Sequence, residues 1–254
     1  MSYTALQDST IRKNHYINAL NFYLTKTDFK ICMIENTNYD ISSLFFYYIK
    51  NKRLEYITFS GNNYDKSLGK GYGEAEIIKF ALQNSRILNQ STYVIKITGR
   101  LIVNNINSIG NNIMYRLIPN ILRFDFMNKI SIQSMCFVCP TMWLNNNIDS
   151  FLSDINDSKG VYFEHALFNS IIKSKGYILL PFYTPPQICG ISGTSNKPYK
   201  VLSKRENLQN NIKHLNSIYA SKKGLFNYFI SKILYTIFII IGNNWNKIIK
   251  NKLK

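Results

Sequence analysis

The sequence predicts an α/β domain in which helices flank a mostly parallel sheet. Its 254 residues are 46% hydrophobic and 18% charged, which suits a folded chain with a substantial core and excludes a disordered one. Short apolar runs of strand length alternate with segments whose apolar residues recur at helical spacing. Because such alternation with short connections favours parallel neighbours, we expect the N-terminal half to form one strand–helix–strand–helix–strand unit.

Six segments of the N-terminal half carry these patterns. We expect helices over residues 12–25, 42–50 and 74–85, and strands over residues 29–35, 54–59 and 93–98. The loops that follow the three strands, residues 36–40, 60–73 and 98–100, are rich in glycine and polar residues. Ligands of parallel sheets bind in such loops, at the carboxyl ends of the strands.

The second half is less regular. We expect strands over residues 121–126, 130–138 and 177–181, the middle one antiparallel, and helices over residues 161–173 and 206–219. A loop with three prolines and two glycines, residues 184–199, lies between the last strand and the last helix.

Charge is concentrated at the C-terminal end of the chain. Lys and Arg number 31 against 14 Asp and Glu, so the net charge of +17 favours anionic partners. Residues 197–254 contain 12 Lys or Arg and a single acid, Glu206. We therefore expect a catalytic domain over residues 1–200 and a basic helical tail over residues 201–254.

Within that tail, residues 225–241 are almost continuously apolar. This run of 17 residues is shorter than the roughly 20 that a membrane-spanning helix needs, and lysines lie on both sides of it. The pattern favours a helix that lies on an anionic membrane surface without crossing it. The alternative is a core helix packed on the domain.

Cysteine usage and the N-terminus bear on the compartment. Four cysteines in 254 residues do not make a disulfide framework, and the pair Cys136 and Cys139 has no second pair to complete a zinc site. Residues 1–14 are polar and lack the apolar stretch of a signal peptide. We expect a cytoplasmic protein, peripheral on the inner face of the cell membrane.

A glycine-rich segment, GKGYGE (residues 69–74), lies at the start of the third expected helix. Backbone N–H groups and a helix N-terminus can hold a phosphate there, and the candidate residues are Lys70, Gly71, Tyr72, Gly73 and Glu74. The segment lacks the Gly-Lys-Ser/Thr of a P-loop and precedes the third strand, so it is no dinucleotide fingerprint either. The alternative is a flexible loop whose glycines serve only turns.

A second basic segment, KITGR, ends the third expected strand. A buried cation at Lys96 is costly unless it is paired or faces a ligand, and Arg100 just beyond the strand could clamp a phosphate. Thr98 and Gly99 lie between them. The alternative is a salt-bridged strand end.

The segments GKGYGEAEIIKFALQNS and YVIKITGR, in this order, resemble the GT-A glycosyltransferases, and residues 31–199 carry the resemblance. The pairing of KGYGE with KITGR is also similar to glycosyltransferase-like proteins of bacterial surface-polysaccharide loci. The resemblance implies a GT-A-like domain that binds a nucleotide-sugar donor and transfers the sugar to a lipid-linked glycan acceptor. We expect no nucleic-acid partner, because the sequence has no run of Lys or Arg interleaved with aromatic residues and no zinc-finger or helix-turn-helix spacing.

One departure from that family concerns the metal. The family's strand ends in a DxD motif that holds a divalent ion, whereas this chain has Thr98-Gly99-Arg100. We expect no cofactor and no metal, with Lys70 and Arg100 neutralising the donor diphosphate. The alternative is a Mn²⁺ or Mg²⁺ ion held through Asp125, which we also name as a catalytic candidate.

Two further segments complete the expected site. Glu164 opens a helix beside the expected cleft, where it could take the proton of an acceptor hydroxyl or merely complement the helix dipole. The segment GISGTS with Ser192 and Gly193, followed by Lys197, could close over a diphosphate or be a plain surface loop.

A different class of function remains open on the sequence alone. A non-enzymatic basic protein that binds anionic membrane or nucleic acid would carry the same charge, with the glycines as loop residues. The position of the cations distinguishes the two. Convergence of Lys70, Lys96, Arg100 and Lys197 on one pocket favours the enzyme, and scatter over a convex face favours the binding protein.

Overall fold

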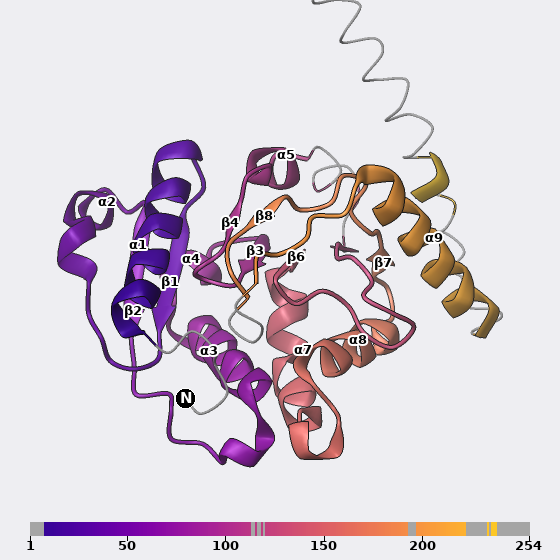
Figure 1. Ribbon diagram of the computed structural model, residues 1–254, viewed down its shortest axis with the longest axis horizontal. Coiled ribbons are helices and arrows are strands. Elements are labelled where there is room, and N and C mark those ends of the chain that lie inside the picture. The colour runs from indigo at the N-terminus through magenta and orange to yellow at the C-terminus, as the bar shows by residue number, and fades with distance from the viewer. Residues whose placement is uncertain are drawn as a thin grey trace, which may run out of the picture.

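The computed structural model describes residues 8–112, 115, 118, 120–192, 197–221, 233 and 235–237 as a mixed α/β chain (Figure 1). Helices and short strands alternate along the chain as expected. In Figure 1 the N-terminal elements lie at one side and α7, α8 and α9 at the other, with β3 and β6 between them.

The N-terminal unit is small and holds the first parallel pair. It contains α1 (Ser9–Lys26), β1 (Ile31–Glu35), η1 (Ser42–Phe45), α2 (Phe46–Lys50) and β2 (Leu54–Thr58). Asp8 caps α1 by accepting the backbone N–H groups of Thr10 and Ile11, which the start of a helix leaves without partners. Strands β1 and β2 run parallel, as the sequence predicts, and a small cluster around Leu20, Leu24 and Phe45 packs against them.

The expected mostly parallel sheet is not what the structure shows. Among the described residues the strands form four two-stranded pairs, of which β1–β2 and β5–β7 are parallel and the other two antiparallel. Strand β3 (Tyr93–Ile97) pairs with β6 (Cys136–Pro140) and not with β1. Strand β3 does not extend the β1–β2 pair because a cleft, which β1 and β3 both line, separates it from β1. Its hydrogen bonds go to β6 instead.

The remaining elements surround the largest part of the core. They are η2 (Lys66–Leu68), α3 (Lys70–Asn84), α4 (Arg86–Asn89), β4 (Ile102–Val103), α5 (Ile106–Gly110), β5 (Ile121–Leu122), α7 (Thr141–Asp154), η3 (Asp157–Lys159), α8 (Phe163–Lys173), β7 (Ile178–Leu179) and β8 (Ile188–Cys189). Helices α3, α7 and α8 pack on one another, and Trp143, Phe151 and Phe163 are fully buried between them.

The first part of the expected tail packs on the domain. Helix α9 (Lys204–Ser221) buries Asn207, Asn211, Leu215 and Ile218, and Tyr235 beyond it belongs to the same core. These contacts favour the packed-helix alternative for this part of the chain. Residues 222–232 and 238–254, with most of the expected anchor, lie outside the described residues. In the described part of the chain, no helix combines the length and apolar character that crossing a bilayer requires.

Candidate functional site

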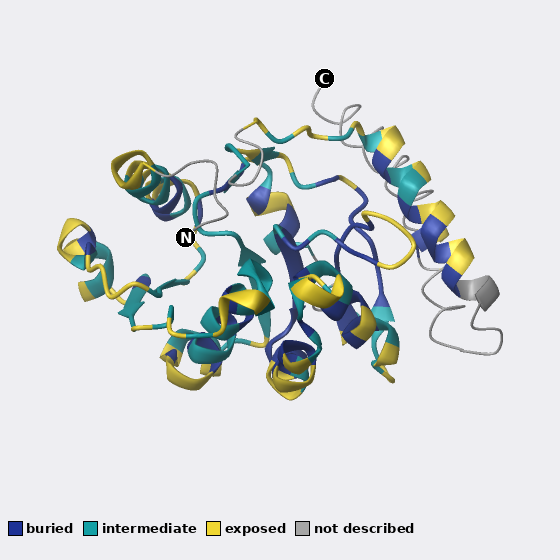
Figure 2. Cartoon of the chain, turned by 60° about the horizontal axis from the view of Figure 1, so that its bottom comes forward, coloured by how far each residue is buried: buried dark blue, intermediate teal, exposed yellow. Residues whose placement is uncertain are grey.

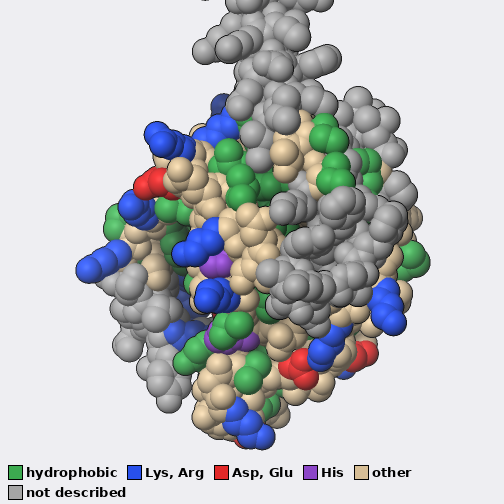
Figure 3. Space-filling view, turned by 90° about the vertical axis from the view of Figure 1, so that its right-hand side faces the viewer, with side chains coloured by type: hydrophobic (Ala, Val, Ile, Leu, Met, Phe, Trp, Pro, Cys, Tyr) green, Lys and Arg blue, Asp and Glu red, His purple; other side chains and the backbone are tan. Residues whose placement is uncertain are grey.

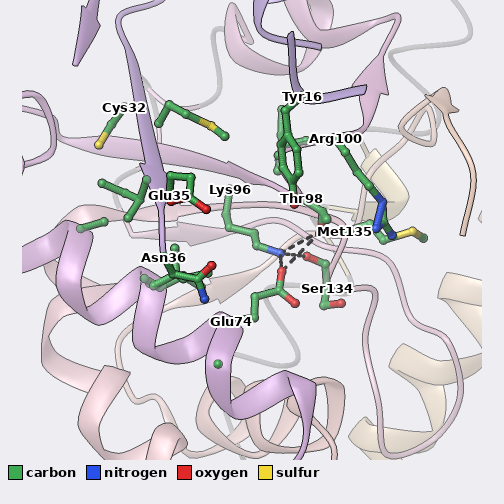
Figure 4. Close-up of a pocket in the computed structure, with 18 of the residues that line it drawn as sticks. Tyr16, Cys32, Glu35, Asn36, Glu74, Lys96, Thr98, Arg100, Ser134 and Met135 are labelled. Carbon is green, nitrogen blue, oxygen red and sulfur yellow. Dashed lines mark hydrogen bonds and ion pairs between the residues drawn. The ribbon is translucent and has the colours of Figure 1, made fainter. Parts of the chain in front are cut away.

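A cleft of about 2390 Å³ opens between the N-terminal unit and β3. Strands β1 and β3 form its walls together with one face each of α1 and α3, and most of the residues that line it are apolar. One group of its polar side chains gathers where β3 ends and α3 begins (Figure 4), and others lie on α1 and at the two ends of β1. The sequence predicts ligand binding at this end of the strands.

Helix α3 begins at Lys70, four residues earlier than the sequence suggests. The preceding Gly69 has a φ of +89°, which favours glycine, and a Cβ there would lie 1.8 Å from the carboxylate of Asp157. The backbone N–H of Lys70 donates to that carboxylate. Asp157, on the distant η3, therefore caps α3 and occupies the helix terminus where a phosphate was expected.

The other glycines of GKGYGE serve packing. A Cβ on Gly71 would lie 2.8 Å from Cβ of Phe163, and one on Gly73 would lie 2.5 Å from the hydroxyl of Tyr64. The start of α3 therefore approaches α8 at Gly71 and the ring of Tyr64 at Gly73, and a side chain at either position would clash. Tyr72 packs against the main core and does not line the cleft.

Lys96 is the centre of a hydrogen-bonded network in the cleft wall (Figure 4). Its ammonium group forms an ion pair with Glu74 and donates to Thr98 Oγ1 at 3.3 Å and to the Ser134 carbonyl at 2.6 Å. An ammonium group has three N–H donors, and these contacts use all of them. Lys96 thus holds α3, β3 and the segment before β6 together and has no donor left for a phosphate. The structure favours the salt-bridge alternative for this residue.

Arg100 and Lys70 both line the cleft, as do four cations from other segments, Arg12, Lys13, Lys30 and Lys66. Burial and the nearby charge of Arg100 lower the pKa of Lys70, so the two side chains lie close enough to repel each other. The Nε of Arg100 is buried and has no hydrogen-bond partner among the described residues. Gly99 lines the cleft beside Tyr16. Two cations this close to each other can bind one anion together.

Glu164 also lines the cleft, from the first turn of α8. Its Oε1 accepts a hydrogen bond of 2.6 Å from the hydroxyl of Ser134, whose carbonyl receives Lys96. Asp157 lies near enough that its pKa is raised, first by burial and then by the charge of Glu164. The sequence analysis missed Asp157. Its signal was the turn Asn156-Asp157-Ser158-Lys159-Gly160, in which an Asn side chain caps a short helix and a glycine ends it.

Asp125 has a structural position outside the cleft. It is almost fully buried and accepts hydrogen bonds from the side-chain amides of Asn211 at 2.8 Å and Asn207 at 3.2 Å. Burial raises its pKa to about 6 despite these bonds. Its contacts join the segment before β6 to α9, and its surroundings do not fit a divalent ion because amide N–H groups already approach the carboxylate.

The cleft does not provide the carboxylates of a DxD motif either, since Thr98, Gly99 and Arg100 occupy that strand end. No group of three or more His, Cys, Asp or Glu side chains that could hold a metal ion occurs within the described ranges. We therefore derive no step through a metal.

The loop that follows β8 lies apart from this site. Ser192 N–H donates to the carbonyl of Lys197 at 2.8 Å, and Ile191 pairs with Pro198, so the two described ends of this loop lie side by side. Neither Ser192 nor Lys197 lines the cleft, although Tyr199 does. Gly193 lies outside the described residues.

Three of the four cations named from the sequence, Lys70, Lys96 and Arg100, thus line one cleft with Glu74 and Glu164, and Lys197 does not. The chain matches no protein-family model, no curated protein and no solved structure, so the likeness to GT-A enzymes rests on its motifs alone.

Proposed function

We propose that this protein is a glycosyltransferase that moves a sugar from a nucleotide-sugar donor to a lipid-linked glycan acceptor at the inner face of the cell membrane. The observation that carries the proposal is the meeting of Lys70, Arg100 and Glu164 in one cleft, from three separate elements. Two cations for a leaving group and one carboxylate for a proton are the parts that such a transfer needs.

The donor diphosphate binds to side chains in this proposal, and not to the backbone of the glycine-rich segment. Asp157 already caps the first turn of α3, so a phosphate placed there would meet a carboxylate. Lys70 and Arg100 reach the cleft beyond that cap. The apolar side chains of β1 and β3 leave room for the nucleoside and the sugar.

Glu164 is the base of a single displacement. The acceptor hydroxyl attacks the anomeric carbon and its proton passes to the Glu164 carboxylate. The bond from that carbon to the diphosphate breaks, and the electron pair leaves with the diphosphate, whose charge Lys70 and Arg100 stabilise. Ser134 orients the carboxylate through Oε1, which leaves the other oxygen for the acceptor proton.

The rival, a non-enzymatic basic protein, is less well supported by the distribution of charge. On the face that carries α9, the Lys and Arg side chains drawn in colour are separated by hydrophobic and neutral groups, with acidic groups among them (Figure 3). A nucleic-acid interface gathers its cations along a track. The cations that do converge in the described part of the chain lie inside a cleft.

A transfer assay with Glu164→Gln tests the proposal. The substitution keeps the shape of the side chain and removes the proton acceptor, so turnover should fall by roughly 10²–10⁴ while donor binding is retained. Glu76→Gln, on α3 outside the cleft, is the matched control and should keep normal turnover. Near-normal turnover of Glu164→Gln would return Glu164 to a capping role, and the absence of transfer with any donor would contradict the proposal itself.

A further inference from the structure

Three large apolar side chains project from the short helical segment before β2. Leu44, Phe46 and Tyr47 are 60%, 67% and 70% exposed. They follow one another within a single turn, and α2 lies at the outer edge of the molecule (Figure 1). A contiguous apolar group of this kind on a protein surface marks an interaction site more often than scattered exposed residues do.

The segment is fixed in this orientation by its opposite face. Phe45, between the exposed residues, is 2% exposed and packs with Ile41 and Leu54 in the small N-terminal cluster. Tyr48 and Ile49 pack partly against the same cluster. Leu44, Phe46 and Tyr47 therefore cannot turn inward without removing Phe45 from its site, and they face solvent as a preformed surface.

Cations lie directly beside this surface. Lys50 ends α2 and Lys52 follows in the turn, and both are exposed. The acids that flank this segment in sequence, Asp40 and Glu55, are both engaged elsewhere. The Asp40 carboxylate accepts the backbone N–H of Ser42, and the Glu55 carboxylate accepts the hydroxyl of Ser85 and the backbone N–H of Arg86. The outer face thus combines an aliphatic residue, two aromatic residues and two lysines, which we call the α2 patch (Leu44, Phe46, Tyr47, Lys50 and Lys52).

We infer that the α2 patch docks the protein on an anionic lipid bilayer. Aromatic side chains insert at the headgroup boundary, and lysines beside them contact the anionic headgroups while their stems cover apolar surface. A nucleic acid would pair with the lysines only and leave the three apolar side chains in water.

A second copy of the chain fits the patch less well. Three side chains supply on the order of 500 Å² of contact, whereas a stable interface needs about 800 Å² from each partner. A symmetric contact would also bring the lysines of the two copies together. The bilayer removes both difficulties, because it is continuous and negatively charged.

No residue of the patch lines the cleft, but the chain connects the two over a few residues. Tyr39, which lines the cleft, is 52% exposed and precedes η1 by three residues. Docking through α2 would hold this end of the cleft near the headgroups, where a lipid-linked acceptor is presented. This step rests on the proposed function, whereas docking itself does not.

The test is sedimentation of the full chain with vesicles of phosphatidylcholine alone or mixed with phosphatidylglycerol, without nucleotide. The triple variant Leu44→Ser/Phe46→Ser/Tyr47→Ser should lower binding to the anionic vesicles by about tenfold or more. Lys50→Gln/Lys52→Gln should also weaken it and reduce its dependence on salt. The control Ile130→Ser/Met142→Ser removes equally exposed apolar side chains elsewhere and should bind as the parent does.

A local probe separates the patch from other cationic parts of the chain. Tyr47→Trp should gain fluorescence that brominated lipids quench in anionic vesicles, beyond the quenching of the parent. Undiminished vesicle binding by the triple variant, or no added quenching at position 47, would overturn the inference. So would an emission shift of Tyr47→Trp that follows protein concentration without vesicles, because the occupant would then be a second copy. Nucleotide binding is measured separately, so failure here leaves the proposed function standing.

Discussion

Strands β1 and β6 have similar apolar sequences but different surroundings. All five residues of β6 are buried, whereas all five of β1 are half-buried. The same contrast extends to their neighbourhoods, since the buried segments of Figure 2 concentrate in the centre of the molecule and the outer elements are largely teal and yellow. Strand β6 has β3 beside it and α7 against it, while one side of β1 faces the cleft.

This difference separates two tasks within one chain. The β6, α7 and α8 region forms a tightly packed body that fixes Ser134 and Glu164 in position. The β1 side supplies a half-buried wall whose five residues all line the cleft. Rigid support on one side and accessible surface on the other is the usual arrangement of a substrate cleft.

This contrast predicts that truncating a side chain to alanine destabilises the fold more in the packed body than in β1. Phe151 is fully buried and meets Phe163 edge to face with 5.2 Å between ring centroids, so Phe151→Ala should destabilise the fold by about 3–5 kcal/mol. Ile34→Ala in β1 should cost less than about 2 kcal/mol, because its side chain is only half-buried. Urea denaturation of the two variants measures both values. Equal losses would mean that β1 is packed as tightly as the body.

The ion pair between Lys96 and Glu74 lies in the wall of the cleft, and removing it should lower the free energy of unfolding. Lys96→Met leaves the carboxylate of Glu74 in a partly buried site without its cation, which should cost about 1–3 kcal/mol. Adding Glu74→Gln should recover part of this loss, and a double-mutant cycle by denaturation measures the coupling. Strict additivity of the two changes would show that the network does not hold the wall together.

The buried carboxylate of Asp125 predicts that the stability of the fold depends on pH. Its pKa is raised from 3.8 to about 6 in the folded protein, so the fold binds this proton more tightly than the unfolded chain does. This contribution to stability is fully present below about pH 4 and is lost as the pH rises through 6. The free energy of unfolding should therefore fall over that window, and Asp125→Asn should remove this part of the fall.

The exposed Asp149 provides the control for that measurement, because Asp149→Asn should leave the fall between pH 4 and 6 in place. A fall that persists unchanged in Asp125→Asn would mean that other groups cause it.

Local pattern was enough to predict most elements, the parallel direction of β1 and β2 and the antiparallel direction of β6, but not which strand pairs with β3. Apolar spacing located α1, β1, β2, β3, α8 and α9. Helix α7 was missed, although Leu144, Ile148, Phe151 and Leu152 recur at helical spacing, because three consecutive asparagines interrupt the segment. The pairing of β3 with β6 joins residues from 39 (Ile97 with Cys136) to 47 (Tyr93 with Pro140) positions apart, and no local signal identifies the two strands as partners.

The candidate site shows the same limit. The residue types next to strand and helix ends were sufficient to predict Lys70, Arg100 and Glu164 as candidate site residues. They could not show that all three N–H donors of Lys96 bond to groups of the cleft wall. Nor could they show that the carboxylate of Asp157, on η3, accepts the backbone N–H of Lys70 at the start of α3. Those facts depend on contacts between distant segments, which a single sequence does not reveal.

The proposed function requires that Lys70 and Arg100 bind the donor diphosphate in the cleft. Calorimetric titration of the full chain with nucleoside diphosphates tests it most directly. Arg100→Ala should weaken the best ligand by about 1.5–3 kcal/mol, the range for a hydrogen bond to a charged group. Arg205→Ala, an exposed arginine on α9 outside the cleft, should bind normally. Unchanged binding by Arg100→Ala, or an equal loss in Arg205→Ala, would contradict the account.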